Sequence, residues 1–228
     1  MEINSLLTHI KRLIIPILNK RFSYLFLTII LLFLVRPFLE HATTANIVTN
    51  IFFWLIIVSC VWAVHEKRKY KWLSIVTASV AILMGVMDFF LQNVLISWAS
   101  KITMVLFLGY AVTVILIYLF RQKTVTSDLI MAAASEYVLI GILWTFLFYV
   151  LEEAYPGSFS FPGSKMNPAG FLYFSFVTLT TTGYGDVLPV SAQARSLAML
   201  EMIMGQLFMA ITVARLVGLY TVSSSHTK

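Results

Sequence analysis

The nine residues Thr178–Asp186, with the sequence TLTTTGYGD, form a short polar run inside a strongly hydrophobic chain. Apolar segments stand on both sides of this run, at residues 169–177 and 194–220. At membrane depth, irregular polar backbone is tolerated where it is buried in protein or lines a water-filled cavity. Threonine and glycine in such a loop are typical of a site that offers backbone oxygens to an ion.

The composition of the chain predicts a membrane protein. Of its 228 residues, 60% are hydrophobic and 11% are charged, whereas a soluble domain carries roughly 25% charged residues. A single cysteine, Cys60, excludes a disulfide within the chain. The net charge of +6 could suggest nucleic acid, but the basic residues are confined to short loops between apolar runs. This distribution favours membrane orientation, with the lipid bilayer as partner and no nucleic acid.

Six apolar segments approach the roughly 20 residues that a membrane-spanning helix needs. They are Phe22–Leu39, Ile47–Val64, Trp72–Leu91, Ile102–Phe120, Tyr137–Leu151 and Ala194–Tyr220. The fifth reaches this length if its helix begins in the preceding linker. A seventh segment, Ala169–Val177, is too short to span and predicts a re-entrant helix. The expected fold is therefore an all-α membrane protein with six transmembrane helices, one re-entrant helix and a polar loop.

Lysines and arginines predict the orientation of these segments, because cytoplasmic loops are enriched in them. With the N-terminus inside, the outer side holds only Arg36, Lys101, Lys165 and Arg195. Both termini are thus expected in the cytoplasm, and Thr178–Asp186 opens outward. Residues 1–21 carry apolar side chains at helical spacing between basic ones, which predicts an amphipathic helix on the inner surface of the membrane. We expect a multi-pass protein of the cell (plasma or inner) membrane.

Residues 22–120 are expected to form a domain of four transmembrane helices. A voltage sensor needs arginines repeated along one helix, but Ile102–Phe120 contains no charged residue. The domain is similar to a voltage sensor in helix number and lacks its sensing charges. Arg36 and Asp88 either pair near the outer ends of their spans or act as separate interface charges.

An inner linker is expected at residues 121–135, with Ser127 capping a helix that begins at Asp128. This linker could transmit motion of the first four spans to the last two, or could be a passive connector. The remaining divisions are a pore domain at residues 136–222 and a short cytoplasmic tail at 223–228, with no soluble regulatory domain expected in the chain.

Two further features are expected between the last two spans. Residues 152–167 are polar and interrupted by proline and glycine, which predicts an outer loop. Asn167 followed by Pro168 predicts the start of a short helix, Pro168–Thr180. The C-terminal end of that helix carries partial negative charge, which favours a cation.

The loop has the residue types that coordination of dehydrated K+ requires. Backbone carbonyls replace the water of the ion without adding full charges. Gly183 and Gly185 allow the unusual backbone angles that aim successive carbonyls at one axis. The Thr181 hydroxyl can add one more oxygen, Tyr184 is expected to pack behind the loop, and Asp186 to hold its outer end. One chain supplies one such strand, so a closed ring requires several copies.

Thr178–Asp186 resembles the signature of the potassium channel family, and the resemblance extends to the whole module around it. The module consists of an outer helix Tyr137–Leu151, a pore helix Pro168–Thr180, a selectivity filter Thr181–Gly185 and an inner helix Ala194–Tyr220. The chain looks like a bacterial member with six spans and one pore loop. The resemblance implies a homotetramer in which K+ binds the carbonyls of Thr181, Thr182, Gly183 and Tyr184 and the Thr181 hydroxyl. K+ is then the permeant ligand, and no cofactor is expected.

Two departures from the family pattern concern the support of the filter. Thr182 stands where valine or isoleucine is usual, and its hydroxyl needs a partner or a water, so filter stability and inactivation are affected more than selectivity. Tyr173 and Phe174 stand where many members carry tryptophans, and Tyr173 could donate a hydrogen bond to Asp186. The expected filter-supporting residues are Thr178, Thr180, Asp186, Tyr173 and Glu201.

In the last span, Gly205 is either a hinge of the inner helix or a glycine that packs closely against a neighbouring helix. The stripe expected to line the cavity is Gln206, Met209 and Val213, and the competing stripe is Phe208, Thr212 and Arg215. Glu201, as an intramembrane carboxyl, is functional by default. It is expected to bond a pore-helix hydroxyl such as Thr178, either as a proton-sensitive anchor or as a structural contact.

The family resemblance implies a homotetrameric, potassium-selective channel that conducts K+ passively. The missing row of arginines predicts that it is not classically voltage-gated. We expect no enzyme, since the sequence has no nucleophile–base pair, phosphate loop or metal cluster. The alternatives are a weakly selective cation channel, a regulatory or non-conducting subunit, and a K+ transporter. Transporters that resemble channels carry several degenerate pore loops in one chain, whereas this sequence has one. The gating stimulus is not predicted.

Overall fold

The computed structural model describes residues 21–35, 38, 45–63, 68–91, 93–161 and 168–225. The elements are α2 (Arg21–Val35), α3 (Ala45–Ala63), α4 (Arg68–Leu91), α5 (Val94–Arg121), α6 (Ser127–Ala154), β1 (Phe159–Ser160), α7 (Pro168–Leu179), β2 (Leu188–Pro189) and α8 (Ala192–Ser225). The two short strands pair antiparallel, with Phe159 opposite Pro189 and Ser160 opposite Leu188. The expectation of a purely α-helical chain missed this sheet, which joins the outer loop to the exit of the filter loop.

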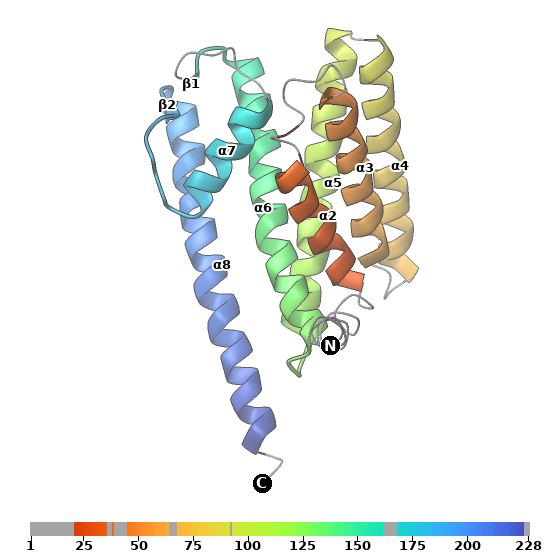
Figure 1. Ribbon diagram of the computed structural model, residues 1–228, viewed down its shortest axis with the longest axis vertical. Coiled ribbons are helices and arrows are strands. Elements are labelled where there is room, and N and C mark those ends of the chain that lie inside the picture. Colours follow the sequence, from red (N-terminus) through yellow and green to blue (C-terminus); the bar gives the residue numbers. More distant parts are fainter. Residues whose placement is uncertain are drawn as a thin grey trace, which may run out of the picture.

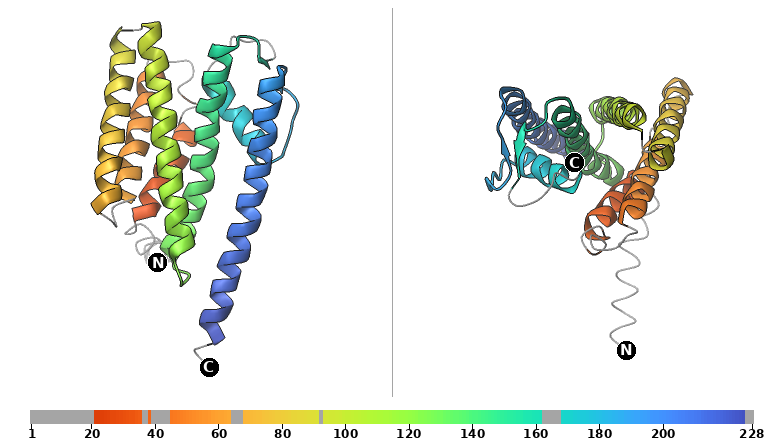
Figure 2. Two further views of the ribbon diagram at one scale, coloured as in Figure 1. Left: turned by 180° about the vertical axis from the view of Figure 1, so that it is seen from behind. Right: turned by 90° about the horizontal axis from the view of Figure 1, so that it is seen from above.

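The helices form two groups that meet at α6 (Figure 1). On one side α6 packs against α2 and α5, with α3 and α4 beyond them, and on the other side it packs against α7 and α8. From behind and from above, α4 and α8 lie at opposite ends of the molecule, with α6 between them (Figure 2). Side chains are buried around most of the α6 circumference, as expected of a helix that separates two groups.

Four of the six expected spans have helices long and apolar enough to cross a membrane: Trp72–Leu91, Val94–Arg121, Ser127–Ala154 and Ala192–Thr221. The other two correspond to shorter apolar stretches of the described chain, Arg21–Val35 and Asn50–Ala63, so six spans and the sidedness of the termini stay predictions. The amphipathic helix expected at residues 1–21 falls outside the described residues except for Arg21, which begins α2. Arg36 also lies outside the described residues, so the choice between a pair with Asp88 and two separate interface charges stays open.

The helix α6 begins earlier than the sequence predicted. Thr126, rather than Ser127, is its N-cap, and its Oγ1 accepts a hydrogen bond from the Leu129 N–H at 3.2 Å. The negative charge of Asp128 in the first turn interacts favourably with the helix dipole. Its Oδ2 also forms an ion pair with Arg21 Nε at 3.6 Å. Most of the expected linker 121–135 is therefore helical, and the connection between α5 and α6 is residues 122–126.

A buried cation joins the N-terminal part of α5 to the C-terminal end of α6. Lys101 lies inside α5, not at its edge, and its Nζ donates to Ser97 Oγ and to the Glu153 carboxylate. The ammonium also lies 4.6 Å from the centre of the Tyr149 ring. Glu152 and Glu153 thus belong to the last turn of α6 and not to the outer loop, where the sequence reading put them.

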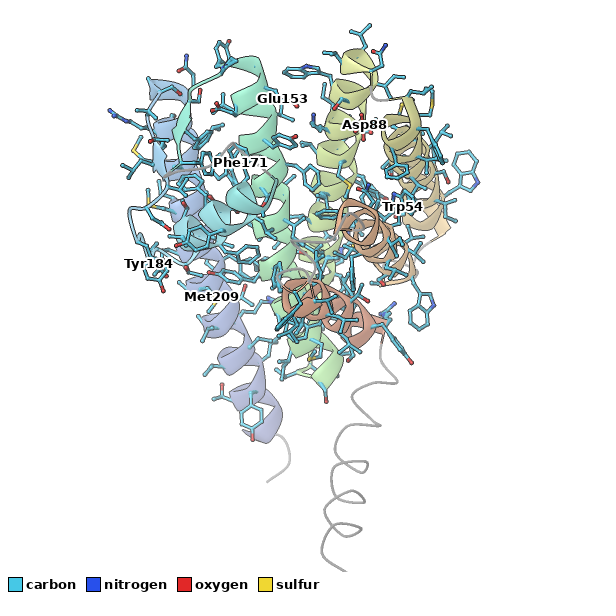
Figure 3. All side chains as sticks on the ribbon, turned by 45° about the horizontal axis from the view of Figure 1, so that its top comes forward. Trp54, Asp88, Glu153, Phe171, Tyr184 and Met209 are labelled. Atoms are coloured by element: carbon cyan, nitrogen blue, oxygen red, sulfur yellow. The ribbon has the colours of Figure 1, made fainter. Side chains whose placement is uncertain are left out.

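Phenylalanine rings fix α7 against α6 and β1. Phe148, Phe159, Phe171 and Phe174 form a cluster in which neighbouring ring centres are 5.0–5.4 Å apart, mostly edge to face. All four side chains are buried, and Figure 3 marks Phe171 on α7 within this packing. The cluster holds the short helix on which the filter loop is mounted.

Candidate ion-conducting site

The backbone of the loop changes handedness at every second residue. Thr181, Gly183 and Gly185 have φ of +57°, +60° and +77°. In an ordinary extended strand successive residues face opposite sides, so a reversal of φ at alternate residues allows neighbouring carbonyls to turn toward one side. Positive φ was expected at the two glycines but not at Thr181, where a β-branched residue at this angle is strained by about 1–3 kcal/mol.

Hydrogen bonds to the last turn of α7 hold this backbone in place. Four consecutive N–H groups of the loop donate to carbonyls of that turn: Thr180 to Phe176 (3.0 Å), Thr181 to Thr178 (2.9 Å), and Thr182 and Gly183 to Val177 (2.9 and 3.3 Å). These carbonyls have no partner within the helix, so the loop satisfies them. The pore helix ends at Leu179, one residue before the predicted end.

The hydroxyl of Thr182 has a partner on the same chain. Its Oγ1 lies 2.8 Å from Thr180 Oγ1, and Thr180 Oγ1 donates to the Phe176 carbonyl at 2.6 Å. Because a hydroxyl has one hydrogen, Thr180 gives its own to Phe176 and accepts that of Thr182. The threonine that departs from the family pattern is therefore hydrogen-bonded.

At the outer end, the loop is supported by Tyr173 of α7. Tyr173 interacts electrostatically with Asp186, and the rings of Tyr173 and Tyr184 stack with centres 6.4 Å apart and planes within 2°. Asp186 Oδ1 also accepts from the Val187 N–H at 3.0 Å. Tyr184 and Met209 both lie on the flank of the molecule away from α3 and α4 (Figure 3), so the loop and the adjoining part of α8 face the same open side.

Glu201 is fully buried behind the loop, and its partner is Ser175 instead of the suggested Thr178. Ser175 Oγ lies 2.5 Å from Glu201 Oε1 and 2.7 Å from the Gly141 carbonyl of α6. Two contacts between oxygens at these distances need two hydrogens, and Ser175 has only one while the carbonyl has none. A protonated Glu201 supplies the second hydrogen, and its carboxyl then links α8 through Ser175 of α7 to α6.

The two candidate cavity stripes of α8 differ in exposure. Met209 and Val213 are 45% and 51% exposed, and Gln206 is exposed as well. In the competing stripe, Phe208 and Thr212 are each 9% exposed and pack within the chain. The geometry therefore favours the first stripe as the one left for a cavity, although lining itself stays a prediction.

Gly205 lies directly against the end of α7. A Cβ at this position would come within 2.9 Å of Leu179 Cδ1 and closer still to the Leu179 carbonyl oxygen. Close packing against Leu179 therefore explains why residue 205 is a glycine. The helix α8 runs without a break from Ala192 to Ser225, so the hinge at Gly205 stays a prediction. The close approach also brings Gln206 Nε2 to 3.2 Å from Thr181 Oγ1.

The sequence reading missed Ser175, the phenylalanine cluster and Glu152. The Glu152 carboxylate is buried and accepts from the N–H groups of Gly157 (2.6 Å) and Phe159 (2.9 Å). It thereby fixes the turn that leads into β1 and the strand pairing beside the loop. An acid at the end of an apolar helix, shortly before a Gly-Ser turn, was the available signal. In the described ranges, no group of three or more His, Cys, Asp or Glu side chains could hold a metal ion.

A comparison with protein families identifies the same module. Residues 136–221 match a family model described as "Ion channel". The match runs from α6 through the loop to α8, supports an ion-channel function for this part of the chain, and leaves α2–α5 outside. Among curated proteins and solved structures, none matches the chain.

Proposed function

We propose that this protein is a potassium-selective channel in which several copies of the chain, four by the family pattern, surround one axis. K+ would pass between carbonyls of Thr181, Thr182, Gly183 and Tyr184, with the Thr181 hydroxyl as a further ligand. The observation that carries the proposal is the reversal of φ at Thr181, Gly183 and Gly185, because it lets successive carbonyls face one side. The ion-channel match over residues 136–221 supports it.

Assembly follows from where the loop lies on a single chain. Residues 181–186 are exposed, and Tyr184 is 72% exposed. Unpaired backbone carbonyls cannot face lipid, so this flank must be covered by further copies or must line water. On α8, the large apolar side chains of Ile203, Leu207 and Ile211 are also about half exposed, which leaves a surface for neighbouring copies beside the polar flank.

Two observations favour the finer features of the proposal. The hydrogen bond between Thr182 and Thr180 leaves no unpaired hydroxyl behind the filter, which supports K+ selectivity over a weakly selective pore. Conventional voltage gating is disfavoured, because α5 carries only Lys101, which is buried and paired with Glu153, and Arg121 at its last residue. K+ is the only ligand proposed, and it passes without chemical change.

The proposal is tested with the purified chain in planar bilayers that separate K+ from Na+. We expect a reversal potential far from zero in the direction of K+, and a value near zero would identify a weakly selective cation channel. Absence of current from pure protein would instead identify a non-conducting subunit.

Gly183→Ala provides the structural arm of the test, and Gly157→Ala its control. Both glycines have positive φ (+60° and +85°), and at neither would a Cβ meet an atom within 4 Å. An alanine is thus strained at both positions, but only Gly183 lies in the proposed filter. We expect Gly183→Ala to abolish K+ selectivity and Gly157→Ala to preserve it. Equal effects of the two substitutions would contradict the assignment of the filter.

A further inference from the structure

Gln206 of α8 reaches the filter loop through its side-chain amide. Its Nε2 donates a hydrogen bond to Thr181 Oγ1 at 3.2 Å. Thr181 begins the filter and has the hydroxyl that is proposed to face an ion. The contact therefore joins the inner helix to the innermost of the proposed ion sites.

Two features around the contact show that the fold is built for it. Gly205 has no room for a Cβ against Leu179, which lets α8 approach the end of α7 closely enough for the amide to reach the loop. Thr181 holds a φ of +57°, a strained angle that persists only where surrounding contacts determine it. The amide hydrogen bond and the bond from the Thr181 N–H to the Thr178 carbonyl are two such contacts.

The chemistry of the contact concerns the direction of the Thr181 hydroxyl. A hydroxyl has one hydrogen and two lone pairs, and a cation is attracted by the lone pairs and repelled by the hydrogen. With its N–H toward Thr181, Gln206 occupies one lone pair and leaves the other for a cation. The terminal amide torsion of Gln206 is broad and two-fold, so the amide can rotate by half a turn. Its Oε1 can then accept the hydroxyl hydrogen of Thr181, which leaves both lone pairs of the hydroxyl oxygen for a cation. In both arrangements the amide determines where the hydroxyl hydrogen points.

We propose that Gln206 is a positioning residue for the innermost cation site and sets how tightly Thr181 holds a cation that enters from the cavity. This inference rests on the proposed function, since it requires the loop to lie on the ion path. In a ring of several copies, the amides form a polar collar directly below the Thr181 hydroxyls. The ligands concerned are K+ and cations of similar radius, of which divalent Ba2+ is a tight-binding probe.

The test is a double-mutant cycle of Gln206→Met and Thr181→Ala. Methionine keeps the length of glutamine and removes the amide, and alanine removes the hydroxyl. For all four proteins, the half-saturating Ba2+ concentration is measured from the protection of the purified assembly against thermal dissociation, which requires no current. We expect Gln206→Met to raise this concentration about tenfold, as loss of about one hydrogen bond implies, and to change it less than about twofold when Thr181 is alanine.

Val217→Met is the control, because Val217 also lies on α8 and is exposed but is about three turns away from Gln206. We expect it to leave the Ba2+ concentration unchanged. A Gln206→Met effect that is absent, or equal in both backgrounds, overturns the positioning role, and so does failure of the natural chain to bind Ba2+. The reversal potential separates this role from the proposed function. If the two substitutions are coupled but the reversal potential is near zero, only the proposed K+ selectivity is contradicted. If the current is K+-selective but the two substitutions are not coupled, only the role of Gln206 is contradicted.

Discussion

The two halves of this molecule use polar side chains differently. In α6, α7 and α8, side-chain hydrogen bonds connect different elements: Ser175 links Gly141 and Glu201, Tyr137 donates to the Leu179 carbonyl, and Gln206 donates to Thr181. In α2, α4 and α5, the hydroxyls of Thr28, Thr77 and Thr113 donate to carbonyls of their own helix four residues earlier. The α6–α8 pore half therefore uses side-chain hydrogen bonds to join separate elements, whereas these three hydroxyls of the α2–α5 half bond only within their own helices.

Buried carboxyls on α6 and α8 repeat this contrast. Glu136 of α6 and Glu201 of α8 are both fully buried. Glu201 bonds Ser175, whereas in the described part of the chain neither oxygen of Glu136 has a hydrogen-bond partner. Glu136 interacts electrostatically with Cys60 of α3, which places it on the side of α6 that faces the apolar half. Glu201 is part of a network through Oε1, whereas Glu136 has no hydrogen bond to any described residue.

The largest expected effect comes from one substitution made in both halves, Phe148→Ala on α6 and Phe107→Ala on α5. Both side chains are at most 1% exposed, so each truncation should lower the free energy of unfolding by about 3–5 kcal/mol. Only Phe148 belongs to the cluster that holds α7. We therefore expect similar losses in thermal midpoint, but altered ion selectivity in Phe148→Ala alone. Altered selectivity in Phe107→Ala would remove the functional distinction between the halves.

Leucine substitutions at the two buried carboxyls should change stability by smaller amounts and in opposite directions. Glu136→Leu should raise stability by about 1–3 kcal/mol, because it removes an uncompensated buried polar group. Glu201→Leu should lower stability, since it breaks the link through Ser175, whereas Glu201→Gln should preserve it because an amide N–H can donate as the protonated carboxyl does. Thermal midpoints of the three variants check these signs. A stabilising Glu201→Leu would show that the network is dispensable.

The protonated state of Glu201 also predicts a dependence on pH. The network needs the carboxyl hydrogen, so K+ current should decline as alkaline pH ionises Glu201, and Glu201→Gln should remove that decline. Tyr137 of α6 also interacts electrostatically with Glu201, and Tyr137→Phe controls for its titration. Identical pH profiles for the natural chain and Glu201→Gln would leave Glu201 a purely structural role.

The same contrast explains how much the sequence could predict. The start of α7 at Pro168 and the unusual backbone angles at Gly183 and Gly185 were predicted closely, because proline is favoured in the first turn of a helix and glycine at positive φ. Positive φ at Thr181 was not predicted, since it is imposed by contacts with α7 and α8 and not by the residue itself.

Partners of buried polar groups were predicted less well. The partner of Glu201 was placed one turn too far along α7, because helical spacing gives Ser175 and Thr178 the same face and only the packing of α8 distinguishes them. In α2–α5, hydropathy indicated apolar helices but not which side chains meet, since many apolar arrangements have similar energy. Lys101 was read as a flanking charge because its partner, Glu153, is 52 residues away in the sequence.

Arg215 gives the smallest expected effect and bears most directly on whether the two halves act on each other. Its Nη2 donates to the carbonyls of Phe120 and Gln122, each at 2.8 Å, at the C-terminal end of α5. A cation is favoured there by the partial charge of the helix end. Arg215→Gln should cost about 1 kcal/mol of stability and change the open probability of the channel without changing its selectivity, because it frees the inner part of α8 from α5.

Arg195→Gln is the matched control for this substitution. Arg195 is also on α8 and donates from Nε to a backbone carbonyl, that of Pro189 at 3.2 Å, but this contact stays within the pore half. Single-channel recordings should therefore show a changed open probability for Arg215→Gln and an unchanged one for Arg195→Gln. If both variants open as the natural chain does, the contact between α8 and α5 only holds the fold together, and α2–α5 act on the pore through packing alone or not at all.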